Sequence, residues 1–249
     1  MTTIADDSKE QALTLLCGGE DPWTWGGDAA SCYFTFERGG TGTISCGENQ
    51  RDWFAIETEW SLTTDPIRVN SNTREFSIQL TFTTRIAPWY HDRNPWLKGA
   101  ALEEHLKNPP PASQAPFPWL PLQSVAFRPK TYSFTLSRGS FVQPFQYFIK
   151  VPYPLFQVKN YGTNRFAPYR YRSQISFKTS PYPPREEWDE SWPNRVALCM
   201  SLDFHRHWEK KNYVRESIAT KDETWMDAFD LRWWLSPTLG DAYKRGRTL

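Results

Sequence analysis

Two acidic side chains that alternate along one predicted strand are the first candidates for chemistry. Glu57 and Glu59 share a strand face with Trp53, because residues two apart on a strand point to the same side. Two carboxyl groups held close together raise the pKa of one of them, which can then act as a general acid or base. The alternative is a structural pair on the surface, for which Arg170 and Arg172 are the predicted partners.

A second group has the residue types of a metal site. Asp203, His205 and His207 alternate, so they share one face if the last predicted strand continues. Three ligands from one strand cannot complete a coordination shell, however, and the other two histidines fall in a predicted loop. We therefore expect a solvated strand end here, with no metal and no cofactor.

The motifs of covalent and nucleotide-dependent catalysis are missing from the sequence. It has no G-x-S-x-G, P-loop or G-x-G-x-x-G motif. Its four cysteines form no C-x-x-C pair, which predicts reduced, buried thiols rather than a disulfide framework or a zinc site. The N-terminus is acidic and lacks the apolar run of a signal peptide, so we expect a cytoplasmic protein.

Alternating apolar residues predict the strands that must position these groups. A short helix over 7–17 ends at Gly18-Gly19, and a glycine-rich turn at 39–42 joins two strands in a hairpin. Phe76, Ile78, Leu80 and Phe82 form one apolar face opposite a polar one. Further strands are predicted at 53–62, 132–136, 170–177 and 196–204, with a hairpin turn at 138–140. Short strands without intervening helices predict an all-β, antiparallel barrel or sandwich.

Two segments interrupt this pattern inside what we expect to be a single domain, 1–249. Residues 86–121 hold a short helical pattern and then a proline-rich stretch, which predicts a stiff loop or lid. In the tail, a capping box at 220–223 precedes aromatic residues that recur every four positions. This pattern predicts a helical extension within 212–249.

Four short elements near the N-terminus carry a family resemblance. They are Leu15-Leu16-Cys17-Gly18-Gly19, Trp23-Thr24-Trp25-Gly26, Phe34-x-Phe36-x-x-Gly39-Gly40-Thr41-Gly42 and Glu57-x-Glu59-Trp60. They resemble the opening of lipocalin-like (calycin) β-barrels, in which a G-x-W element closes the base of the barrel. The segment 180–188 is similar to one in fungal proteins of this size. The resemblance implies one antiparallel barrel, and it extends to fungal proteins of secondary metabolism that include small Diels–Alderase-type pericyclases.

The composition favours a small apolar ligand over a nucleic acid or a membrane. The 249 residues include 29 Lys and Arg and 28 Asp and Glu, so positive and negative charges nearly balance. Proteins that bind nucleic acids or anionic membranes need concentrated positive charge. No apolar run is long enough to span a membrane. With 13 Trp, 11 Tyr and 16 Phe, much of the apolar mass lies on rigid rings, which suit a flat, unsaturated ligand.

Together with the resemblance, these features predict a cofactor-independent cyclase that folds a polyene for an intramolecular Diels–Alder reaction. The predicted cavity wall consists of Phe34, Trp53, Trp60, Tyr132 and Tyr171, and the predicted polarising groups are Glu57, Arg172 and Gln174. Two alternatives stay open. One is a non-catalytic carrier of an apolar metabolite, and the other is an interaction protein with a solid barrel and a partner-binding C-terminal helix. A packed aromatic core would produce the same alternation of rings.

Overall fold

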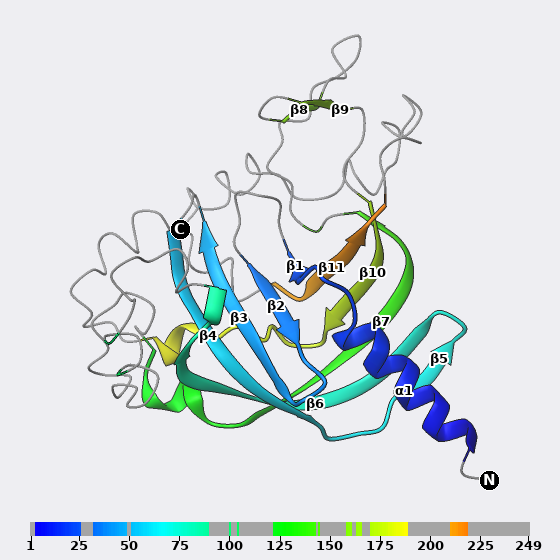
Figure 1. Ribbon diagram of the computed structural model, residues 1–249, viewed down its shortest axis with the longest axis horizontal. Coiled ribbons are helices and arrows are strands. Elements are labelled where there is room, and N and C mark those ends of the chain that lie inside the picture. The colour runs from blue at the N-terminus through cyan, green and yellow to red at the C-terminus, as the bar shows by residue number, and fades with distance from the viewer. Residues whose placement is uncertain are drawn as a thin grey trace.

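The main sheet of the computed structural model is a ring of antiparallel strands (Figure 1). Neighbouring strands follow the order β4-β3-β2-β1-β11-β10-β7-β6-β5. An additional pairing of β4 with β6 closes the ring and leaves β5 at its edge. The all-β class predicted from the sequence is confirmed.

The structure describes residues 3–25, 32–48, 51–89, 122–142, 170–188 and 210–218, together with 100, 104, 144, 158–160 and 163–165. Within this part, helix α1 spans Thr3–Cys17, and the short 3-10 helices η2 and η3 span Ser124–Phe127 and Arg185–Glu187. The strands of the main sheet are β1 (Trp23–Thr24), β2 (Tyr33–Phe36), β3 (Thr41–Glu48), β4 (Arg51–Leu62), β5 (Ile67–Asn70), β6 (Thr73–Ile86), β7 (Lys130–Val142), β10 (Arg170–Phe177) and β11 (Asn212–Ser217). A separate pair is formed by β8 (Val158–Asn160) and β9 (Thr163–Arg165).

Alternation along the strands separates the inside of the ring from its outside. On β6, the predicted face of Phe76, Ile78, Leu80 and Phe82 is buried, and the polar side chains between them are more exposed. Strand β10 follows the same rule, with its odd-numbered residues from Ser173 to the end of the strand buried. Because only one face of each strand is buried, the register of the strand is fixed. A shift by one residue would turn the apolar side chains outward and the polar ones inward.

The N-terminal helix and the first hairpin form as the sequence predicts. Helix α1 ends at the two glycines: Gly18 N–H donates to Thr14 O (2.8 Å), and Gly19 has a φ of 91°. In the turn between β2 and β3, Gly40 has a φ of 83°, a conformation that costs glycine little. Both turns therefore need glycine at these positions.

Two expectations about secondary structure are wrong. The segment expected to begin a helical extension at residue 212 is instead strand β11, which pairs with β1 and β10. The triplet 138–140, predicted as a hairpin turn, lies inside the continuous strand β7, where the register against β10 shifts. This register shift is a β-bulge, in which an extra residue such as glycine fits into a strand without ending it. The helix predicted after 220, the strand predicted at 196–204 and nearly all of the 86–121 segment lie outside the described residues.

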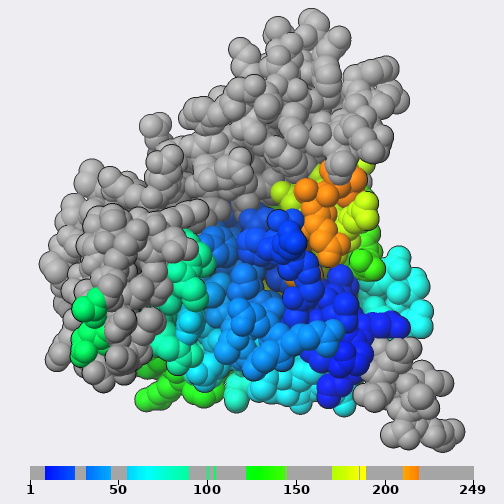
Figure 2. Space-filling view, in the orientation of Figure 1, coloured from blue at the N-terminus to red at the C-terminus, as the bar shows by residue number. Residues whose placement is uncertain are grey.

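A buried arginine joins the two ends of the described chain. The Arg215 guanidinium on β11 lies 4.1 Å from the centre of the Trp23 ring on β1, and these two side chains are 3% and 0% exposed. Arg215 donates to Leu16 O (3.1 Å) and to Leu15 O, at the C-terminal end of α1. The carbonyls at a helix C-terminus lack helical partners and carry partial negative charge, so they suit a cation. Figure 2 shows β11 in orange directly beside the blue surface of the first residues.

We expect Arg215→Met to lower the free energy of unfolding by about 3 kcal/mol, since hydrogen bonds from a charged donor to buried carbonyls are lost. Urea denaturation followed by tryptophan fluorescence measures this change. Arg138→Met is the matched control, because the Arg138 side chain is mostly exposed and should contribute less than about 0.5 kcal/mol. Equal effects of the two substitutions would show that the Arg215 contacts are not stabilising.

Candidate functional site

The acidic pair predicted as a general acid or base lies on the outside of the ring. On β4, Ile56 and Trp60 are buried, so Glu57 and Glu59 point the other way. Both carboxylates bind Arg85 of β6: Arg85 Nε donates to Glu57 Oε2 (2.5 Å) and Nη2 donates to Glu59 Oε1 (2.9 Å). These hydrogen bonds raise the pKa of Arg85. The arginines predicted as partners, at 170 and 172, were the wrong ones.

The other two predicted polarising groups also point away from the interior. Arg172 is exposed, and Gln174 is half-buried on the outer face of β10, whereas their neighbours Ser173 and Ile175 are buried inside. Because successive side chains of a strand alternate between faces, neither residue can reach a molecule inside the ring from this register. The structure therefore does not bring Glu57, Arg172 and Gln174 together with the predicted aromatic wall.

Two of the predicted wall residues are part of a packed core. Phe34 is surrounded by other rings, with ring centres 5.2 Å from Tyr213 and 5.6 Å from Tyr182. Trp60 packs edge-on against Phe36 at 5.6 Å, and its Nε1 donates to Thr41 O (2.8 Å). Such tilted and edge-to-face contacts are favourable arrangements of aromatic rings. Around these residues, then, the inside of the ring is filled by side chains.

The structure does not place the other two predicted residues, at 53 and 171, in this core. Trp53 belongs to β4, and its side chain lies outside the described part. Tyr171 is half-buried near the start of β10, where it lies opposite Phe141 of β7. Phe177, at the other end of β10, lies opposite Phe134. Tyr171 is thus separated along the strand from the rings near Phe177.

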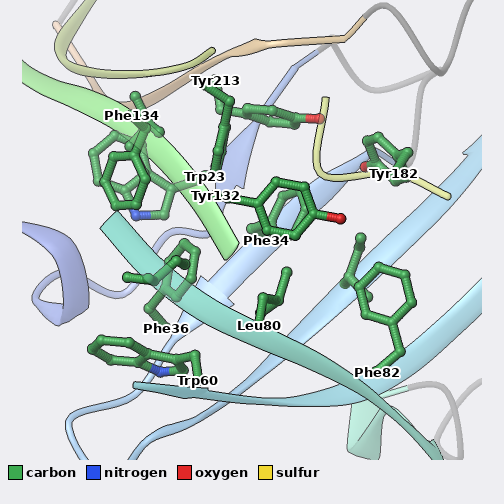
Figure 3. Packing of buried hydrophobic residues seen from close by; sticks show 14 of the residues in the cluster. Trp23, Phe34, Phe36, Trp60, Leu80, Phe82, Tyr132, Phe134, Tyr182 and Tyr213 are labelled. Carbon is green, nitrogen blue, oxygen red and sulfur yellow. The ribbon is translucent and has the colours of Figure 1, made fainter. Parts of the chain in front are cut away.

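Tyr132 differs from the other predicted wall residues. It is 7% exposed on the inner face of β7, and its ring packs edge-on against Phe177 at 6.4 Å. Its hydroxyl makes no hydrogen bond with any other described residue. Figure 3 shows this hydroxyl directed toward the side of the core formed by Tyr182 and Phe82. Burial raises the pKa of Tyr132, and the negative charge of Glu187 raises it further, so the hydroxyl keeps its proton.

A half-buried ion pair lies next to Tyr132. Lys130 Nζ binds Glu187 Oε2, and the two side chains are 24% and 12% exposed. The same ammonium group lies 5.8 Å from the centre of the Phe82 ring. Lys130 and Tyr132 are two residues apart on β7 and therefore share the inner face. Lys130 is not among the residues predicted from the sequence, although a lysine in phase with Tyr132 on an apolar strand face indicates an inward-facing cation.

Glu187 reaches this position because residues 180–188, which we call the strap, are hydrogen-bonded to β3 and to the residue that precedes η2. Tyr182 Oη donates to Ser45 O (2.7 Å) of β3, and Trp188 Nε1 donates to Pro183 O (3.0 Å) within the strap. Gln123 N–H donates to Glu187 O (2.7 Å). Near the end of the strap, η3 lies beside η2 (Figure 1). It brings a carboxylate to the inner face of a strand that is 57 residues away in sequence.

The candidate site is therefore the Tyr132 hydroxyl with the Lys130–Glu187 pair and the rings of Phe82 and Tyr182. It offers a neutral hydrogen-bond donor and a paired cation against apolar surface. No group of three or more potential metal ligands occurs among the described residues, and the predicted group at 203–207 lies outside them. In the same part of the chain, no helix has both the length and the apolar character needed to cross a membrane.

Comparisons of the chain with protein-family models, with curated proteins and with solved structures give no match.

A double-mutant cycle on Lys130 and Glu187 tests the ion pair. Lys130→Met and Glu187→Gln should each lower the free energy of unfolding by about 1.5 kcal/mol, because each leaves a half-buried partner unpaired. The double variant should lose no more than either single one. The control cycle uses Lys178 and Glu75, a more exposed pair whose coupling should stay below about 0.5 kcal/mol. Additive effects at Lys130 and Glu187 would contradict the pairing.

Proposed function

We propose that this protein binds a small, apolar, unsaturated molecule at Tyr132 and promotes its cyclisation without a cofactor. The observation that carries this proposal is the Tyr132 hydroxyl, which faces inward and has no hydrogen-bond acceptor among the described residues. A ligand oxygen that accepts from this hydroxyl would add a hydrogen bond next to apolar surface, where such a bond contributes more than it does in water. The closed antiparallel ring and the buried Trp23 at the start of β1 support the lipocalin-like barrel that the sequence resembles.

The surroundings of Tyr132 favour a neutral oxygen acceptor over an anionic one. Lys130 is already paired with Glu187, so it offers no free positive charge to a carboxylate. The charge of Glu187 also acts at the Tyr132 hydroxyl and would repel an anion placed there. A ketone, ester or amide carbonyl attached to an apolar, unsaturated chain fits both conditions. The rings of Phe82 and Tyr182 supply the flat apolar contact.

The reaction that suits such a site is an intramolecular Diels–Alder cycloaddition. Three π bonds become two carbon–carbon σ bonds and one π bond, and no proton or electron leaves the molecule. A rigid aromatic surface would hold the diene and the dienophile in a near-attack arrangement, which lowers the entropic part of the barrier. The Tyr132 hydroxyl would polarise the dienophile carbonyl as negative charge grows on its oxygen. Non-catalytic binding of the same kind of molecule is the alternative.

The role of the hydroxyl is tested with two ligands that differ only in the carbonyl. Tyr132→Phe should weaken binding of a linear triene ketone about fivefold, the value of one neutral hydrogen bond. Binding of the triene hydrocarbon should not change. Titration calorimetry measures both affinities, and Tyr33→Phe, on the outer face of β2, is the matched control. An equal loss for both ligands would contradict a bond to the carbonyl, and no binding of either would favour a solid interior.

Turnover separates the cyclase from a carrier. The wild-type protein should accelerate cyclisation of the triene ketone over buffer and give one stereoisomer in excess. The Tyr132→Phe variant should be about tenfold slower, because it cannot polarise the carbonyl. Chiral chromatography of the products measures the rate and the stereoselectivity together. Tight binding of the ketone with an unchanged cyclisation rate would leave only the carrier.

A further inference from the structure

A second buried lysine, far from Tyr132, contacts a cysteine. Lys210 Nζ donates to Cys32 Sγ at 3.1 Å, and the two residues are 1% and 0% exposed. They lie 178 positions apart in sequence. Lysine is rarely fully buried in proteins, and here its amine is enclosed in contact with a thiol. The function proposed above uses neither residue.

The strands hold the two groups against each other. Cys32 precedes β2, and its carbonyl accepts a backbone hydrogen bond from Trp25 N–H (3.0 Å). Lys210 precedes β11, and β1 lies between β2 and β11 in the ring. The Trp25 ring covers the amine, with its centre 3.8 Å from Nζ. The nitrogen is therefore confined between an aromatic face and a sulfur atom, and it needs little movement to reach that sulfur.

We propose that Cys32 and Lys210 form an oxidation-dependent covalent cross-link, a direct bond between Sγ and Nζ. The proposed reaction starts from the thiolate of Cys32, the form that attacks a peroxide, beside the ammonium group of Lys210. In the first step the sulfur of Cys32 bonds to one peroxide oxygen and the O–O bond breaks. The departing hydroxide takes a proton from the Lys210 ammonium and leaves as water. The products are a Cys32 sulfenic acid, oxidised by two electrons, and a neutral amine beside it.

In the second step the amine nitrogen attacks the sulfur. The N–S bond forms, the S–O bond breaks, and the leaving hydroxide takes one proton from the nitrogen and departs as a second water. Hydrogen peroxide is the oxidant, and it is reduced to water. The protein loses two hydrogen atoms in total. The product is a sulfenamide, a class of bond that thiols reduce.

Intact-mass spectrometry and a tryptic map of the peroxide-treated full chain test this proposal. We expect the loss of two hydrogens and a joined peptide pair that contains Cys32 and Lys210, both reversed by excess thiol. Cys32→Ser and Lys210→Arg should abolish the joined pair. Arginine keeps a buried cation but is not a nucleophile, so Cys32 in that variant should gain oxygen atoms instead.

The half-buried cysteine at 17 provides the matched control. Burial raises the pKa of the Cys17 thiol to about 11, so at neutral pH it stays protonated and reacts slowly with peroxide. Cys17→Ser should therefore leave the Cys32–Lys210 peptide pair unchanged. This variant also excludes a Cys17–Cys32 disulfide, which would give the same mass change, and the tryptic map distinguishes disulfides to Cys46 or Cys199 by their peptides. Oxygen gain at Cys32 in the wild type, an unmodified Cys32, or a joined pair with an oxygen between the two atoms would overturn the proposal. If a variant does not fold, the wild-type peptide map still decides the outcome.

Discussion

The contact between Arg215 and Trp23 stabilises the ring of strands at one place, the seam between β1 and β11. Backbone hydrogen bonding closes the ring only weakly there. Strands β1 and β11 share a single pair of opposed residues, Thr24 and Val214. Across that seam, Arg215 covers the Trp23 ring and donates to two carbonyls at the end of α1. Burial lowers the pKa of Arg215, and the charge of Glu216, 3.8 Å away, opposes this effect. Glu216 has a φ of 62°, a strained conformation that persists only when its surroundings impose it.

Closure of the ring divides the side chains into two environments with different electrostatics. On the outside, pairs such as Arg85 with Glu57 are partly hydrated, so they add little to stability and perturb few groups. On the inside, rings exclude water, and each polar group has larger consequences there. Lys130 is paired with a carboxylate and Lys210 contacts a thiol, and the Tyr132 hydroxyl has no hydrogen bond to another described residue. Tyr132 and Lys210 are each the basis of a chemical proposal, and the Lys130–Glu187 pair restricts the ligand that fits beside Tyr132.

Alternation in the sequence was enough to predict most of the strands, because one face of each must be apolar. It correctly identified the apolar face from Phe76 to Phe82 as the buried face of β6. It failed for β11, since six residues that include a buried arginine do not show an apolar face. It also failed to choose between the two faces of β4, where Trp53 and Glu57 alternate with Ile56 and Trp60. Glu57 was placed on the wrong side for this reason. Arg172 and Gln174 were placed on the wrong side of β10 in the same way, because alternation alone does not tell which face points inward.

The sequence by itself determined the all-β class, the glycine turns, the N-terminal helix and the aromatic character of the interior, because these follow from local conformation and periodicity. Only the tertiary structure decided which polar groups meet. Glu57 and Arg85 are 28 residues apart, Lys130 and Glu187 are 57 apart, and Cys32 and Lys210 are 178 apart. Such pairs depend on strand order and on the closure of the ring, which no local pattern encodes. The chemistry of the interior therefore came from the fold, even though each residue was already visible in the sequence.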